Sequence, residues 1–100
     1  MKHWVMDYET LSNCFTGVFE HYKTTETKVF VIHDLRNDLD EFINFLEENF
    51  NNKEWHISYN GLAFDAQVTH YIIDNHIDWS DLSGCEIASI IYRYAQRCIQ

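Results

Sequence analysis

Three acidic residues in this 100-residue chain are spaced so that they could hold a divalent cation. Asp7 and Glu9 follow an apolar run at residues 4–6 that is typical of a β-strand, and side chains two positions apart on a strand leave by the same face. Asp65 comes half a chain later, shortly after Asn60. Carboxylate oxygens are ligands that Mg²⁺ prefers, and paired metal ions can activate a water and stabilise the leaving oxygen of a phosphodiester. The spacing therefore predicts metal-dependent hydrolysis.

These two segments resemble the first two motifs of 3′-5′ proofreading exonuclease domains, which are DnaQ-like members of the ribonuclease-H-like superfamily. The resemblance is closest to the domains of family B and protein-primed phage DNA polymerases. In that family Asp-x-Glu-Thr lies on the first strand, and Asn-x(2 or 3)-Phe/Tyr-Asp follows the fourth strand at the start of a helix. The matching positions in this chain are Asp7, Glu9, Thr10, Asn60, Phe64 and Asp65.

The resemblance implies a two-metal site for Mg²⁺ or Mn²⁺. Asp7 would contact both ions, Glu9 would contact one, and Asp65 would contribute to the surroundings of the second. It also implies a substrate, the 3′ end of single-stranded or frayed DNA, whose terminal phosphodiester is hydrolysed. The residues implied to bind that substrate are Thr10, Leu11, Asn60 and Phe64.

The family completes its site with a fourth aspartate in a Tyr-x-x-x-Asp or His-x-x-x-x-Asp motif on a later helix, and the one pair after Asp65 with either spacing, His76 and Asp81, lies too close to Asp65 in sequence to be that motif. We therefore expect residues 1–100 to form a single partial 3′-5′ exonuclease domain that is weakly active or inactive alone. The expected partner is a polymerase domain or a C-terminal remainder, in cis or in trans. A truncated gene, a proteolytic product and a natural small protein all remain open.

Hydrophobic periodicity predicts the elements that position these residues. Strands are expected at 4–9, 15–22, 28–33 and 54–59, and helices at 35–50, at 64–73 and from 84 to the end. The fourth strand should lie parallel to the first and so bring Asp65 beside Asp7. This order, three antiparallel strands, a helix, a parallel strand and helices, predicts an α/β ribonuclease-H-like fold that is C-terminally incomplete and lacks the usual fifth strand.

The first predicted helix shows the clearest amphipathic pattern. Asp38 and Glu41 suit a capping box at its start. Its apolar face is expected to comprise Leu39, Phe42, Ile43, Leu46 and Phe50.

Composition agrees with one compact domain but opposes general binding to nucleic acid. Sixteen Asp and Glu against seven Lys and Arg give a net charge of −9, which repels a polyanion. A complete nuclease would need basic surface from elsewhere. Three cysteines without metal-ligand spacing suggest reduced thiols. No apolar run is long enough for a membrane span, so we expect no membrane partner and a cytoplasmic location in a bacterium or phage-infected host.

Simpler interpretations remain open for each acidic residue. Asp7 and Glu9 could be solvated residues at a strand end, although the apolar run before them predicts a buried strand, where unpaired acids cost several kcal/mol. Asp65 could be an acid that is favoured only by the helix dipole. The alternative function is a non-catalytic, acidic, phage-like binding protein that uses a degraded exonuclease scaffold to bind a basic partner.

Overall fold

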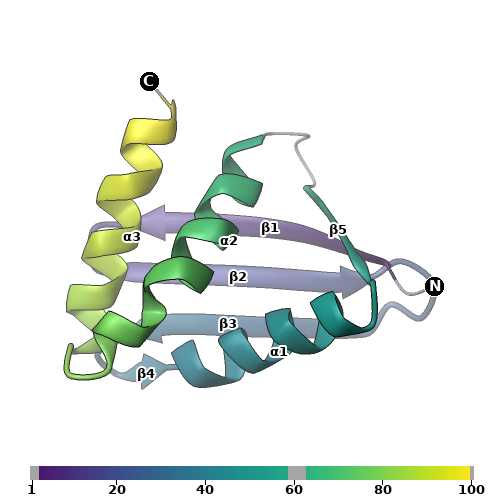
Figure 1. The fold of residues 1–100 in the computed structure, drawn as a ribbon, viewed down its shortest axis with the longest axis horizontal. Coiled ribbons are helices and arrows are strands. Elements are labelled where there is room, and N and C mark those ends of the chain that lie inside the picture. Colours follow the sequence, from purple (N-terminus) through teal and green to yellow (C-terminus); the bar gives the residue numbers. More distant parts are fainter. Residues whose placement is uncertain (1–2, 59–62, 100) are drawn as a thin grey trace.

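The computed structural model describes residues 3–58 and 63–99 (Figure 1). It contains a mixed β-sheet with three α-helices packed on one face of it. The strands are β1 (His3–Leu11), β2 (Cys14–His21), β3 (Thr27–His33), β4 (Arg36–Asn37) and β5 (Trp55–Ser58). The helices are α1 (Leu39–Asn51), α2 (Ala63–Asn75) and α3 (Gly84–Ile99), with a 3₁₀ turn η1 (His76–Trp79) between the last two.

The strand order in the sheet is β4-β3-β2-β1-β5. All neighbouring strands are antiparallel except β1 and β5, which are parallel and pair from His3 with Trp55 to Met6 with Ser58. The three predicted antiparallel strands and the predicted parallel pairing with the first strand are thus confirmed. The short strand β4 was not predicted, because two residues are too few to show a period.

Alternation along the strands divides the sheet into a buried face and an open face. Trp4, Met6 and Tyr8 of β1 are at most 5% exposed and pack in one apolar core with residues of all three helices. The intervening side chains point to the opposite face. There Asp7 pairs with Val18, which is 38% exposed, so the described helices leave that face uncovered.

The start of α1 differs from the prediction in position and in capping. The helix begins at Leu39, not at Leu35, because residues 36–37 pair with β3. The Asp38 carboxylate makes no cap hydrogen bond with the helix. It accepts instead from the Val31 amide at 2.9 Å and from Arg36 Nε at 2.7 Å. The predicted capping box is therefore wrong, since β3 and β4 compete for the same carboxylate.

The predicted apolar face of α1 is confirmed for its first four members, which are buried in the core: Leu39, Phe42, Ile43 and Leu46. The fifth, Phe50, is wrong, because its side chain is 82% exposed. It lies in the last turn of α1, at the edge of the sheet.

The start of α3 is capped by its own residues and is packed closely against the end of β3. Ser83 and Glu86 form a capping box, in which Glu86 N donates to Ser83 Oγ at 3.2 Å and Ser83 N donates to Glu86 Oε1 at 3.0 Å. The Cys85 amide also donates to Asp34 Oδ1 at 2.8 Å. Gly84 lies so close to β3 that a Cβ built on it would be 2.2 Å from the His33 carbonyl oxygen.

Candidate functional site

Asp65 is the most unusual ionisable residue in the described structure. It lies in the first turn of α2 and is only 2% exposed. Its Oδ2 atom accepts a hydrogen bond of 2.8 Å from Ser58 Oγ, at the end of β5. Its Oδ1 atom is buried and has no hydrogen-bond partner among residues 3–58 and 63–99. A buried carboxylate oxygen without a donor is unfavourable, so this atom has unused capacity to bind a proton or a cation.

The surroundings of Asp65 raise the pKa of its carboxyl group above the ordinary value. Burial is the largest cause, because it disfavours the charged form. The negative charge of Asp7 raises this pKa further, whereas the hydrogen bond from Ser58 lowers it. Ser58, which donates to Asp65, pairs with Met6, so the Asp65 carboxylate lies near the part of β1 that carries Asp7, as expected from the parallel pairing of β1 and β5.

Asp7 and Glu9 lie on the open face of β1, and both are exposed to solvent. The prediction that these two acids lie on a buried strand is wrong for their side of it, because α1, α2 and α3 all cover the opposite face. The desolvation penalty inferred for these acids consequently does not apply. Tyr8, between them, points into the core as predicted.

The three predicted ligands approach the same edge of the sheet from two sides. Ser58 pairs with Met6, so it shares the helix-covered face, and Asp65 joins it there. Asp7 and Glu9 project from the other face. Within residues 3–58 and 63–99, no group of three or more His, Cys, Asp or Glu side chains is close enough to hold a metal ion.

A second polar contact beneath Asp65 joins β1 to α2. The Tyr8 hydroxyl is 2.5 Å from Thr69 Oγ1, one turn further along α2. Burial raises the pKa of Tyr8, and the Asp65 charge adds to this effect. Sequence reasoning missed both Ser58 and Thr69. Two features of the sequence could have indicated them. Ser58 ends a predicted strand in phase with its buried face, and Thr69 follows Asp65 by one helical turn.

The residues implied to bind substrate are distributed unevenly. Thr10 is half-buried and is in phase with Tyr8, so it points to the face opposite Asp7. Leu11 is 54% exposed at the end of β1. Phe64 is partly buried and packs against the core. Asn60 lies outside the described residues.

The carboxylate oxygens of Asp7, Asp65 and Glu9 could supply some of the ligands of a divalent cation. The negative charges of Asp7 and Asp65 repel each other, and Asp65 Oδ1 has no donor among the described residues, so a divalent ion that both carboxylates could reach would neutralise both. Glu9, two positions along the same face as Asp7, could contribute a further oxygen.

Comparisons with protein-family models, curated proteins and solved structures gave no match. Among the described helices, none combines the length and apolar character that crossing a membrane requires. Cys14, Cys85 and Cys98 are free thiols.

Proposed function

We propose that this chain is part of a metal-dependent 3′-5′ exonuclease of the proofreading type, with a ribonuclease-H-like fold. The observation that supports the proposal best is the buried Asp65 carboxylate, which has an unpaired oxygen and interacts with Asp7. The strand order β3-β2-β1-β5, with β5 parallel to β1, agrees with the proposed fold.

In this proposal Asp7, Glu9 and Asp65 hold Mg²⁺ or Mn²⁺. When bound, the metal ions would supply Lewis-acid stabilisation and a nucleophilic water for hydrolysis of the terminal phosphodiester. Ser58 orients the Asp65 carboxylate by donating to one of its oxygens, which leaves the other oxygen for the cation. Thr10, Leu11, Asn60 and Phe64 would contact the 3′ end of the DNA strand.

The proposed enzyme needs two contributions that residues 1–100 lack. One is a fourth carboxylate, and the other is basic surface to offset a net charge of −9. We propose that a polymerase domain or another chain segment, in cis or in trans, supplies both. We place the enzyme in the cytoplasm of a bacterium or of a phage-infected cell, where free thiols stay reduced.

A non-catalytic binding protein is the second candidate function. It is favoured by the absence, among the described residues, of a cluster of three possible metal ligands. It is also favoured by the net charge, which suits a basic partner.

Titration with Mn²⁺, followed by thermal unfolding, tests the proposed site. Because a ligand that binds only the folded state stabilises it, Mn²⁺ should raise the Tm of the parent chain. It should raise the Tm much less in Asp7→Asn and in Asp65→Asn. The control is Glu20→Gln, which removes an exposed acid from β2 on the same open face and should respond like the parent.

A Tm response that is equal in the parent, in Asp7→Asn and in Asp65→Asn would remove the metal site and favour the binding protein. If the response depends on Asp7 and Asp65, the second step is a nuclease assay. A C-terminal segment with a Tyr-x-x-x-Asp motif should then increase Mn²⁺-dependent degradation of a single-stranded oligonucleotide. No degradation with or without that segment would contradict the exonuclease while leaving the cation site intact.

A further inference from the structure

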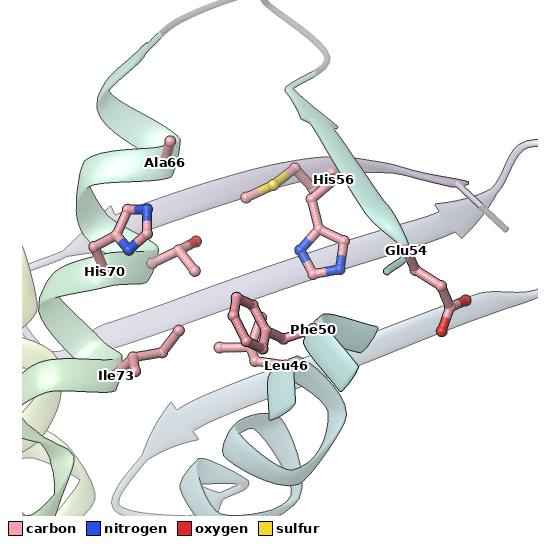
Figure 2. A pocket seen from close by; sticks show the side chains of 9 residues that line it. Leu46, Phe50, Glu54, His56, Ala66, His70 and Ile73 are labelled. Carbon is pink, nitrogen blue, oxygen red and sulfur yellow. The ribbon is translucent and has the colours of Figure 1, made fainter. Parts of the chain in front are cut away.

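A cavity of about 230 Å³ opens between α1 and α2, and neither Asp7 nor Asp65 lines it. Figure 2 shows Ala66, His70 and Ile73 of α2 on one side, and Leu46 and Phe50 of α1 with His56 of β5 on the other. The lining is mostly apolar. An apolar cavity of about 150 Å³ is enough to bind benzene, so this cavity can accept one aromatic or branched aliphatic side chain.

Exposed apolar side chains continue from the cavity across the surface. Phe50 is 82% exposed and Ile73 is 37% exposed, and both line the cavity. Phe50 also lines a neighbouring hollow together with Trp55, which is 63% exposed. Adjoining exposed apolar residues of this size, beside a cavity, indicate a binding surface more than scattered surface residues do.

The two helices that border this groove are acidic, and Glu54 lines the cavity between them. A third hollow, of about 420 Å³, lies on the opposite flank of α1 and is lined by Glu41, Glu48 and Glu54 and also by Lys28. Glu54 lines all three hollows. Neither α1 nor α2 contains a Lys or Arg. From residue 37 to residue 92, the sequence has eleven Asp and Glu but only one Lys or Arg, Lys53, which lines the hollow shared by Phe50 and Trp55.

This charge distribution selects the kind of partner. A second copy of the chain would bring another net charge of −9 to the same place, and a nucleic acid would bring phosphates, so both are repelled. A positively charged segment is attracted to α1 and α2, which carry Asp and Glu but no Lys or Arg, and can place an apolar side chain in the cavity. Association of this kind is steered by charge and anchored by burial of an apolar group.

We propose that the groove between α1 and α2 binds a basic segment of a partner protein, with one aromatic or branched aliphatic side chain in the cavity and flanking Lys or Arg residues beside Glu54 and the acidic side chains of α1 and α2. The proposal specifies where the second candidate function, the binding protein, would meet its partner. It does not depend on the cation site. Peptide affinity should therefore be unchanged in Asp7→Asn, whatever the outcome of the Mn²⁺ titration.

The test uses the capped peptide Lys-Lys-Trp-Lys-Lys, titrated into the isotopically labelled chain and followed by NMR. Amide shifts are expected in α1 and α2, with an affinity that falls as salt is added. Phe50→Ser should raise Kd about tenfold, equivalent to ~1.4 kcal/mol. Leu35→Ser is the matched control, because Leu35 is 91% exposed but lies between β3 and β4. Ala66→Trp, which fills the cavity from an exposed position of α2, should also weaken binding.

Several outcomes would overturn the proposal. One is equal affinity for Lys-Lys-Gly-Lys-Lys, which would show attraction by charge alone. Indole binding as tightly as the Trp peptide would identify a small-molecule cavity. A parent dimer that Phe50→Ser converts to monomer would make the occupant a second copy. Absence of binding, or a Kd that neither Phe50→Ser nor Ala66→Trp changes, would exclude the groove.

Discussion

Ser58 Oγ donates a hydrogen bond of 2.8 Å to Asp65 Oδ2 and thereby joins the end of β5 to the first turn of α2. The contact places a carboxylate over the edge of the sheet at which Asp7 leaves β1. It satisfies only one of the two Asp65 oxygens, and the other is buried without a donor in the part of the chain that the structure describes. This half-satisfied carboxylate is the basis of the first prediction.

Asp65→Asn should stabilise the metal-free chain at pH 7 by on the order of 1 kcal/mol, because it removes a buried charge with an unpaired oxygen. Folding raises the Asp65 pKa, so ionisation of this group opposes folding. The gain should be largest above the raised pKa and should disappear as pH falls below the ordinary carboxyl pKa. Urea unfolding at several pH values measures it. Asp74→Asn, an exposed position on α2, is the control. A less stable Asp65→Asn at pH 7 would contradict the assignment.

Acidification should destabilise the chain through His56. Burial lowers the pKa of this imidazole, opposed in part by Glu54. Asn49 Nδ2 lies 2.8 Å from His56 Nε2, and the amide nitrogen donates, so the ring is neutral. Just below the ordinary histidine pKa, His56 therefore binds a proton in the unfolded chain but not in the folded chain. Stability should fall as pH decreases below the ordinary histidine pKa, by at most about 1.4 kcal/mol per pH unit for this one group.

The variant His56→Phe isolates this contribution. It should lower stability at neutral pH, because Asn49 loses its partner, but it should also flatten the dependence between pH 7 and pH 5. His70→Phe, at an exposed position of α2, should keep the slope of the parent. An unchanged slope in His56→Phe would assign the pH dependence to other histidines.

Gly84→Ala should destabilise the chain by about 1–3 kcal/mol, the usual range for overpacking. The added Cβ would lie 2.2 Å from the His33 carbonyl oxygen, so the start of α3 would have to move away from β3. Helix propensity alone predicts the opposite sign, since Ala is favoured over Gly by about 1 kcal/mol within helices. Urea unfolding decides between them, with the exposed Gln96→Ala on α3 as a near-neutral control. A Gly84→Ala variant as stable as the parent would refute the close approach.

Thr10→Val tests the proposed role of Thr10 in binding the DNA substrate. If Thr10 binds the sugar or phosphate of a DNA 3′ end, its loss should weaken binding of a single-stranded oligonucleotide by about 1–2 kcal/mol. Mn²⁺ affinity should be nearly unchanged, because Thr10 points to the face opposite Asp7. Fluorescence anisotropy at low salt and Mn²⁺ titration are measured side by side. Thr16→Val, on the open face of β2 beside Glu9, is the control. Equal strand affinity in the parent and Thr10→Val would remove Thr10 from the substrate site.

The sequence by itself determined the kind and order of the main elements. Strict alternation placed Tyr8 in the core and Asp7 on the other face, and a helical period identified four of the five predicted inward residues of α1. The helix between two strands also implied that β5 is parallel to β1, which is confirmed. These inferences depend on local periodicity, which the chain shows within a few residues of each position.

Only the tertiary structure decided which faces are covered. Asp7 and Glu9 follow apolar neighbours, yet they are exposed because the described helices pack on one face of the sheet. Phe50 continues the apolar period of α1 but lies beyond the edge of the core. Asp38 has the residue type of a helix cap, but β3 and Arg36 compete for its carboxylate. In each case the outcome depends on partners distant in sequence or on an alternative hydrogen bond, which the local pattern of residues does not specify.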